Sequence, residues 1–314
     1  MKLPRLNRIL NLPGKNRPRF QDQNPAALRR YHGTVTAAIR KSAPCAIGKV
    51  GTTELMGLEY LDRRIQLPWP RSASWYRPAH RLYMCSGVFP TTKKSFLAWA
   101  ETYHLALGSL DVVGQWQPPG TYLAQYEDAC LAEYAPQARR CGGSLLSPFH
   151  PLAPWITDLL SLRWLVITPF VQTAKSQLDK LPHLGIYPRN SQKALKRLST
   201  HISFISSPPF AYMKKPVDQD WGKALERLKG LMETKEFDLA LIGAGAWSLP
   251  LAVHAKTLGR KGIHLGGITQ LLFGIRGGRY DCSGIYDASN KAWTRPLPNE
   301  TPGKNRLMEN GAYW

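Results

Sequence analysis

The feature that most constrains the fold is a run of seventeen residues, 239–255, that contains no Asp, Glu, Lys or Arg. The run is marginally short for a membrane span. Gly243, Gly245 and Pro250 also interrupt it, as expected where a strand, a loop and a helix join. We therefore predict a buried strand over 237–242, a glycine loop, and a helix over about 249–258 with Ser248 as its N-cap.

A second glycine loop follows the next predicted strand. That strand covers 262–265, Gly266 and Gly267 come next, and a helix is expected over about 268–273. Glycine loops at strand-to-helix junctions let phosphates approach backbone amides, and neighbouring strand ends form a crevice. We expect the two loops to lie side by side and bind a nucleotide, with His264 as a hydrogen-bonding group. Alternatively, the glycines serve only backbone angles and His264 is structural.

Strands and helices alternate along the rest of the chain. Helices are predicted over 25–40, 52–63, 91–107, 122–134, 171–181 and 220–234, and strands over 45–50, 110–113, 163–168 and 201–205. We expect the strand 163–168 to be central and residues 66–90 to be irregular. The alternation predicts an α/β fold with a mainly parallel, Rossmann-like sheet flanked by helices.

The charge balance points to anionic partners. The chain has 42 Lys and Arg against 21 Asp and Glu, a formal net charge of +21, which selects a class of partner and not a reaction. We predict a basic N-terminal arm over 1–30, suited to contact the inner face of an anionic membrane, and a single domain over 31–314. Five widely spaced cysteines without a CxxC pair, and no secretion signal, indicate a reducing cytoplasm.

The first glycine loop does not complete a dinucleotide-binding motif. Ser248 stands where the third glycine would be, and the next strand ends in His264 and Leu265 with no acidic residue for a ribose. A nicotinamide- or flavin-dependent dehydrogenase is therefore disfavoured.

Near the N-terminus, a cation and an acid flank another predicted strand-to-helix turn. The turn reads Lys49-Val-Gly51-Thr52-Thr-Glu54, which places Glu54 in the first turn of the helix. Glu54 could bind a ligand there. It could equally complement the helix dipole or form a capping box.

This turn resembles the Arg/Lys-x-Gly-Asp-x-Glu turn of the GT-D-fold glycosyltransferases. Further resemblance lies in Ile167-Thr-Pro-Phe170, in residues 238–277 and in Gly311-Ala-Tyr-Trp314, so that it spans most of 40–314. The resemblance implies a GT-D-type fold and metal-assisted transfer of a sugar from a nucleotide-sugar donor. The acceptor would be a surface polysaccharide, a lipid-linked glycan or a protein.

The resemblance also implies roles for single residues. The family's acidic pair binds a divalent ion, Mn²⁺ or Mg²⁺, whereas Thr52 replaces the first acid here and leaves Glu54 as the metal and catalytic carboxylate. Asp281 is a second catalytic candidate. Glu59 and Asp62 remain alternative general bases, so inverting and retaining courses are both open. The predicted nucleotide-sugar site comprises Lys49, Gly51, Thr52, Gly243, Gly245, Ser248, His264, Gly266, Gly267, Arg276 and Arg279.

A rival interpretation is a noncatalytic protein that binds nucleic acid or an anionic surface. Tryptophan and tyrosine lie among basic residues in 69–78 and could stack on bases. The basic residues are dispersed along the chain, however, and no known nucleic-acid motif is present. Nucleic acid is therefore the less favoured partner.

Overall fold

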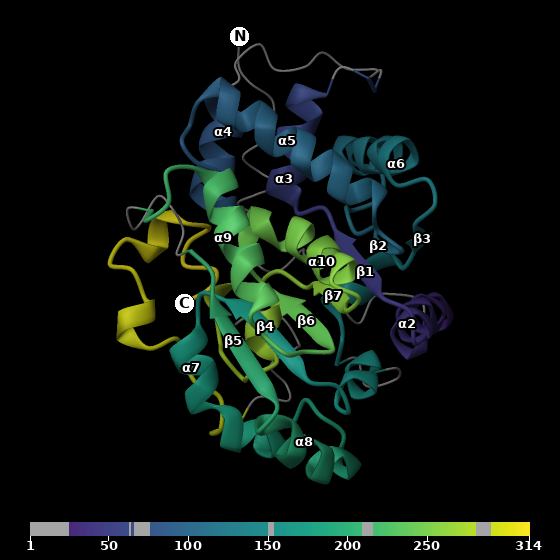
Figure 1. Cartoon of the computed structure of the whole chain (residues 1–314), viewed down its shortest axis with the longest axis vertical. Coiled ribbons are helices and arrows are strands. Elements are labelled where there is room, and N and C mark those ends of the chain that lie inside the picture. The colour runs from purple at the N-terminus through teal and green to yellow at the C-terminus, as the bar shows by residue number, and fades with distance from the viewer. Residues whose placement is uncertain (1–24, 63, 66–75, 150–153, 209–215, 281–289) are drawn as a thin grey trace.

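The computed structural model describes residues 25–62, 64–65, 76–149, 154–208, 216–280 and 290–314. Most of the predicted basic arm, most of the aromatic segment 69–78, and Asp281 lie outside these ranges. The fold is α/β, with seven parallel strands in one sheet between two layers of helices (Figure 1). The parallel Rossmann-like sheet predicted from the alternating pattern is confirmed.

All seven strands of the sheet run parallel, in the order β3-β2-β1-β7-β6-β4-β5. Helices cover both faces, which explains why β1, β4, β6 and β7 are buried at every position. The strands are β1 (Cys45–Lys49), β2 (Val112–Gly114), β3 (Arg139–Arg140), β4 (Trp164–Thr168), β5 (Ile202–Ser206), β6 (Leu239–Ile242) and β7 (Lys261–His264).

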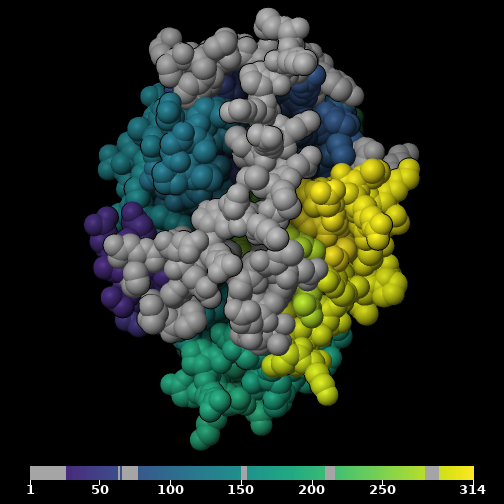
Figure 2. Space-filling model, turned by 180° about the vertical axis from the view of Figure 1, so that it is seen from behind, coloured from purple at the N-terminus to yellow at the C-terminus, as the bar shows by residue number. Residues whose placement is uncertain are grey.

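One core cluster joins the sheet to α3 (Thr52–Leu61), α4 (Tyr76–Arg81), α5 (Lys93–Gly108), α6 (Tyr122–Tyr134), α9 (Trp221–Glu233) and α10 (Ser248–Thr257). A second cluster, on the other face, joins it to α2 (Pro25–Arg40), α7 (Val171–Ser176), α8 (Gln192–Ser199) and α11 (Ile268–Leu271). Seen from behind, residues 290–314 (yellow) form one flank of the molecule and α2 (purple) lies toward the other (Figure 2). No helix among the described residues is both long and apolar enough to cross a bilayer.

Several predicted elements need correction. Within the described part of 66–90, residues 76–86 are helical and not irregular, because α4 and a π-helix, η3 (Leu82–Ser86), occupy them. Pro78 lies in the first turn of α4, where a proline is tolerated. The strand β4 is not central but second from the edge, between β6 and β5. Strand β3 and helix α8 were not predicted, and α2 begins inside the predicted arm.

The carboxyl ends of β1 and β7 form a divergence point in the chain. These strands are direct neighbours. The chain leaves β1 into α3, on one face, and leaves β7 toward α11, on the other face. In open parallel sheets, ligands bind in the crevice where the loops of adjacent strands part in this way. The fold therefore directs attention to Lys49 and His264, the last residues of the two strands.

Candidate functional site

Lys49 places a buried ammonium group at the carboxyl end of β1. The residue is 7% exposed, and its Nζ lies 4.8 Å from the centre of the Trp116 ring. Burial lowers the pKa of Lys49 to about 8, Glu54 and Glu127 oppose this shift, and the charge of Arg279 adds to it. At neutral pH the site therefore contains a largely protonated amine that is shielded from water.

His264 faces the same space from β7. A Cβ atom on Gly266 would lie 3.5 Å from Lys49 Nζ and 3.6 Å from His264 Nε2. Gly266 has a φ of +63°, which an L-residue adopts only with strain. Burial and the charge of Lys49 hold the pKa of His264 well below its usual value, against a hydrogen bond to the Lys49 backbone, so the imidazole is neutral. Its Nδ1 is buried without a hydrogen-bond partner among the described residues.

The two glycine loops are adjacent, as predicted, because β6 pairs with β7. Gly243 approaches Gly266 so closely that a Cβ would lie 2.5 Å from the Gly266 carbonyl oxygen. Gly245 has a φ of +56° and packs against Ser86, whose carbonyl oxygen would lie 2.6 Å from an added Cβ. Packing against the protein therefore already requires glycine at both positions. Gly267, the N-cap of α11, is half-buried.

Ser248 does not cap α10, because Trp247 is the N-cap and Ser248 begins the helix. Its buried hydroxyl instead accepts a hydrogen bond of 2.8 Å from the Ala244 N–H. This bond closes the first glycine loop on itself. The Ser248 hydroxyl therefore already has a hydrogen-bond partner within the protein.

Glu54 lies in the first turn of α3, as predicted, and is buried. Its carboxylate folds back over Gly51, where an added Cβ would collide with Oε2. Burial raises the pKa of Glu54, while hydrogen bonds from its own backbone N–H and from Ser86, and the charge of Lys49, counteract that rise. This arrangement favours the helix-start role of Glu54.

The divalent metal that the resemblance implies stays a prediction, because Asp281 lies outside the described residues. Among them, no three His, Cys, Asp or Glu side chains come together in a way that could hold a metal ion. The Glu54 carboxylate is turned toward Gly51 and Ser86. The Thr52 hydroxyl accepts a hydrogen bond of 3.2 Å from Gln117.

A loop after β2 completes one side of the site and was not predicted. Trp116 covers Lys49 and donates its indole N–H to the Val50 carbonyl at 2.8 Å. Gln117 reaches Thr52, the first residue of α3. The expected mainly parallel sheet places the ends of β1 and β2 at the same edge, but only the strand order shows that these two strands are neighbours.

Arg279 approaches the site from the C-terminal part of the chain. Its charge acts on Lys49 and Glu54, and its guanidinium lies 4.7 Å from the centre of the Tyr313 ring and pairs with Glu309. Its backbone N–H donates to the Ala312 carbonyl at 3.0 Å. Arg276 is half-buried, and its backbone N–H donates to the Thr294 carbonyl at 2.7 Å. Residues 290–314 therefore hold both arginine-bearing turns.

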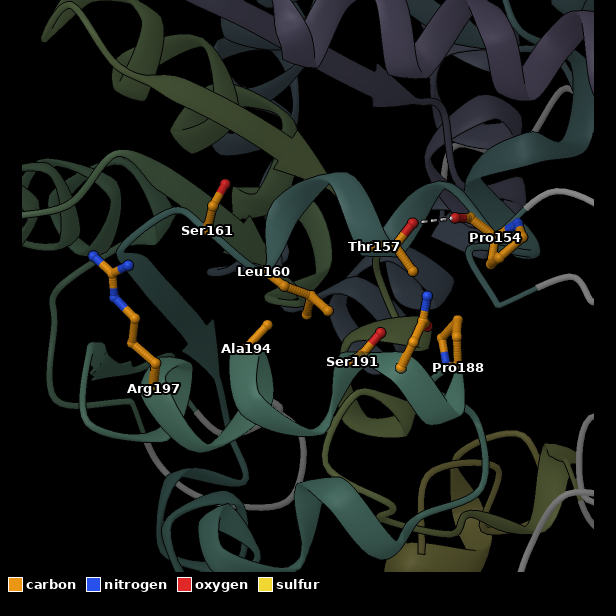
Figure 3. A pocket seen from close by; sticks show the side chains of 9 residues that line it. Pro154, Thr157, Leu160, Ser161, Pro188, Ser191, Ala194 and Arg197 are labelled. Atoms are coloured by element: carbon orange, nitrogen blue, oxygen red, sulfur yellow. Dashed lines mark hydrogen bonds between the residues drawn. The ribbon is translucent and has the colours of Figure 1, made fainter.

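A cavity of about 460 Å³ lies elsewhere, between α8 and the residues that lead into the amino end of β4 (Figure 3). Arg197 lies at one end of it, and Pro154 and Pro188 lie at the other. None of the predicted site residues lines this cavity. We place the candidate site at the carboxyl edge instead, because the buried charges and the diverging loops are there.

Comparison with known proteins adds no assignment to this site. No family model matches the chain, and neither does any curated protein or solved structure. The resemblance to the GT-D-fold enzymes therefore stays a prediction that rests on the quoted motifs.

Proposed function

We propose that the chain is a glycosyltransferase that binds the diphosphate of a nucleotide-sugar donor over Gly266, between Lys49 and His264. One observation carries the proposal: a buried ammonium and a buried imidazole face one position at the point where the loops of β1 and β7 diverge. Burying an ammonium group is costly unless an anion compensates it. A donor diphosphate in the crevice would supply that compensation.

The charges around the site suit a leaving nucleoside diphosphate. Lys49 and Arg279 would stabilise the negative charge that develops as the bond to the sugar breaks. The neutral His264 would donate a hydrogen bond to a phosphate oxygen, or would donate to or accept from a sugar hydroxyl. No step is assigned to a metal, because the described carboxylate Glu54 accepts hydrogen bonds from its own backbone N–H and from Ser86.

The broader setting of the reaction also belongs to this proposal. Transfer would take place in the cytoplasm, to a polysaccharide, a lipid-linked glycan or a protein. The rival, a binding protein for nucleic acid or an anionic surface, draws its support from the net charge of +21. A surface-binding function does not explain why the Lys49 ammonium group is buried, because such a protein needs its cations on the outer surface.

A matched pair of glycine variants tests the proposed site. Gly266 and Gly259 both have positive φ, +63° and +75°, but an added Cβ at Gly259 meets nothing within 4 Å. Each change to alanine should cost about 1 kcal/mol of stability through backbone strain. Only Gly266→Ala also places a methyl group between Lys49 and His264.

The measurement is a thermal-shift screen of nucleoside diphosphates and nucleotide sugars on the full chain. We expect a ligand to raise the Tm of the wild type and of Gly259→Ala, and to raise that of Gly266→Ala much less. Equal ligand-induced shifts in the two variants would exclude the crevice as the site. No shift with any of these ligands would count against a nucleotide-sugar donor altogether.

A further inference from the structure

Glu127 is a buried acid for which the proposed reaction has no use. It lies in α6 and is 1% exposed. Its Oε2 accepts two backbone hydrogen bonds, from the Trp116 N–H at 3.1 Å and the Gln117 N–H at 3.0 Å. Its Oε1 is buried and makes no hydrogen bond within the described part of the chain. Burial of a carboxylate at such a cost indicates a structural or functional task for the loop that it holds.

The loop held by Glu127 is tied to the candidate site at three points. The Trp116 ring covers the Lys49 ammonium, and the Trp116 indole N–H bonds to the Val50 carbonyl. The Gln117 amide donates to the Thr52 hydroxyl. A shift of this loop would therefore uncover Lys49 and release the start of α3 at the same time.

We propose that Glu127 is a positioning residue, which fixes the Trp116–Gln117 loop so that Lys49 is held in place for the donor diphosphate. The inference rests on the proposed function, since it assigns Lys49 to that diphosphate. Glu127 touches no reacting atom and acts through the loop and through its charge.

Electrostatics give this role a pH signature. Burial raises the pKa of Glu127 to about 7, against the two backbone hydrogen bonds, and Asp128 raises it further while Lys49 lowers it. The ionised carboxylate in turn raises the pKa of Lys49, as Glu54 does, whereas Arg279 lowers it. His264 stays neutral. The charge of Glu127 also raises the pKa of Arg140, against the effect of burial. Removing the charge of Glu127 should therefore weaken the binding of a diphosphate above pH 7. The effect on affinity should disappear below pH 7, where Glu127 is protonated in the wild type as well.

The experiment is calorimetry of inorganic pyrophosphate and UDP binding to the full chain between pH 6 and pH 9. It compares the wild type with Glu127→Gln and with Glu133→Gln, a matched change at an exposed acid of the same helix. At pH 8, Glu127→Gln should bind roughly tenfold more weakly than wild type. At pH 6, where Glu127 is mostly protonated, the two should agree within about twofold. Glu133→Gln should match the wild type throughout, and comparison at each pH cancels the titration of pyrophosphate itself.

A second variant keeps the test decisive if Glu127→Gln does not fold. Trp116→Phe keeps a ring over Lys49 but deletes the N–H to Val50, and it should also weaken pyrophosphate binding. If both variants fold, their effects on affinity should be non-additive, because they act through one loop. A pH profile of Glu127→Gln that parallels the wild type, or unchanged binding by Trp116→Phe, overturns the inference alone. Failure of the wild type to bind either ligand overturns the proposed function as well.

Discussion

At the scale of single residues, two buried lysines show how the surroundings decide the cost of a charge. Lys261, at the start of β7, donates to the carbonyl oxygens of Lys41 and Ala43 at 2.6 and 3.0 Å. Lys49, at the end of β1, lies beside an aromatic ring, and its pKa is lowered to about 8. The Lys261 ammonium group is stabilised by its hydrogen bonds to two backbone carbonyl groups. The burial of Lys49, in contrast, disfavours its charged form and so lowers the stability of the fold. Function-bearing residues often carry such a cost.

We therefore expect Lys49→Met to stabilise the protein while it removes pyrophosphate binding. The folded-state pKa lies below the unfolded value, so Lys49 destabilises the fold most below pH 8 and not at all above the unfolded pKa. The gain should be on the order of 2 to 3 kcal/mol at pH 7 and shrink by pH 10, measured by urea unfolding. Lys261→Met, which strands two carbonyl groups, should lower stability instead. A loss of stability in Lys49→Met would show that the ammonium is compensated within the protein.

At the scale of elements, carboxylates cover the starts of two helices at the carboxyl edge of the sheet. Glu54 folds over the start of α3. Glu300, from the C-terminal part of the chain, accepts hydrogen bonds from the Gln172 N–H at 2.7 Å and the Thr173 N–H at 3.0 Å, at the start of α7. Both positions would otherwise attract anions. In the loop after β7, the described atoms nearest to a Cβ on Gly266 belong instead to the Lys49 ammonium and the His264 imidazole.

Removal of the Glu300 carboxylate should loosen the C-terminal part of the chain. Glu300→Ala leaves the α7 N–H groups uncapped and should cost about 1 to 2 kcal/mol of stability. Limited proteolysis should then cut residues 290–314 faster than in the wild type. Glu236→Ala, which removes a surface partner of Arg163, serves as the control and should change stability by less than about 1 kcal/mol. Equal proteolysis of the two variants would contradict the capping role.

At the scale of the whole molecule, the net charge of +21 and the buried Lys49 predict two kinds of anion binding. Surface cations should attract any polyanion, and salt screens such contacts strongly. A buried cation is screened much less, because the protein excludes the counterions. The salt dependence of binding therefore separates the proposed function from its rival.

We expect polynucleotide affinity to fall steeply between 50 mM and 200 mM salt, and pyrophosphate affinity to fall far less over the same range. Fluorescence anisotropy and calorimetry can measure the two. Lys49→Met should abolish pyrophosphate binding and leave polynucleotide binding unchanged, because Lys49 contributes little to the outer surface. Parallel salt slopes for the two ligands would favour the surface-binding rival.

Local patterns in the sequence determined most of the elements. Helix α6 occupies the predicted 122–134, and the two glycine loops lie at adjacent strand ends as expected. Such features follow from short-range physics, since apolar periodicity defines helices and strands, and alternating strands and helices favour parallel pairing. The sequence likewise identified Lys49, His264 and Gly266 as residues at the ends of strands.

Only the tertiary structure decided which groups lie next to Lys49, His264 and Gly266. The order of the strands brings β7 beside β1, so that Lys49 and His264 share one space, and it moves β4 toward the edge. The fold also turns Glu54 onto Gly51 and places Glu127 behind the loop over Lys49. No local pattern encodes these contacts, because each joins side chains whose neighbourhood arises from the packing of separate elements. The sequence determined the helices, the strands and the chemistry of their side chains. Packing determined which of these side chains lie in one site.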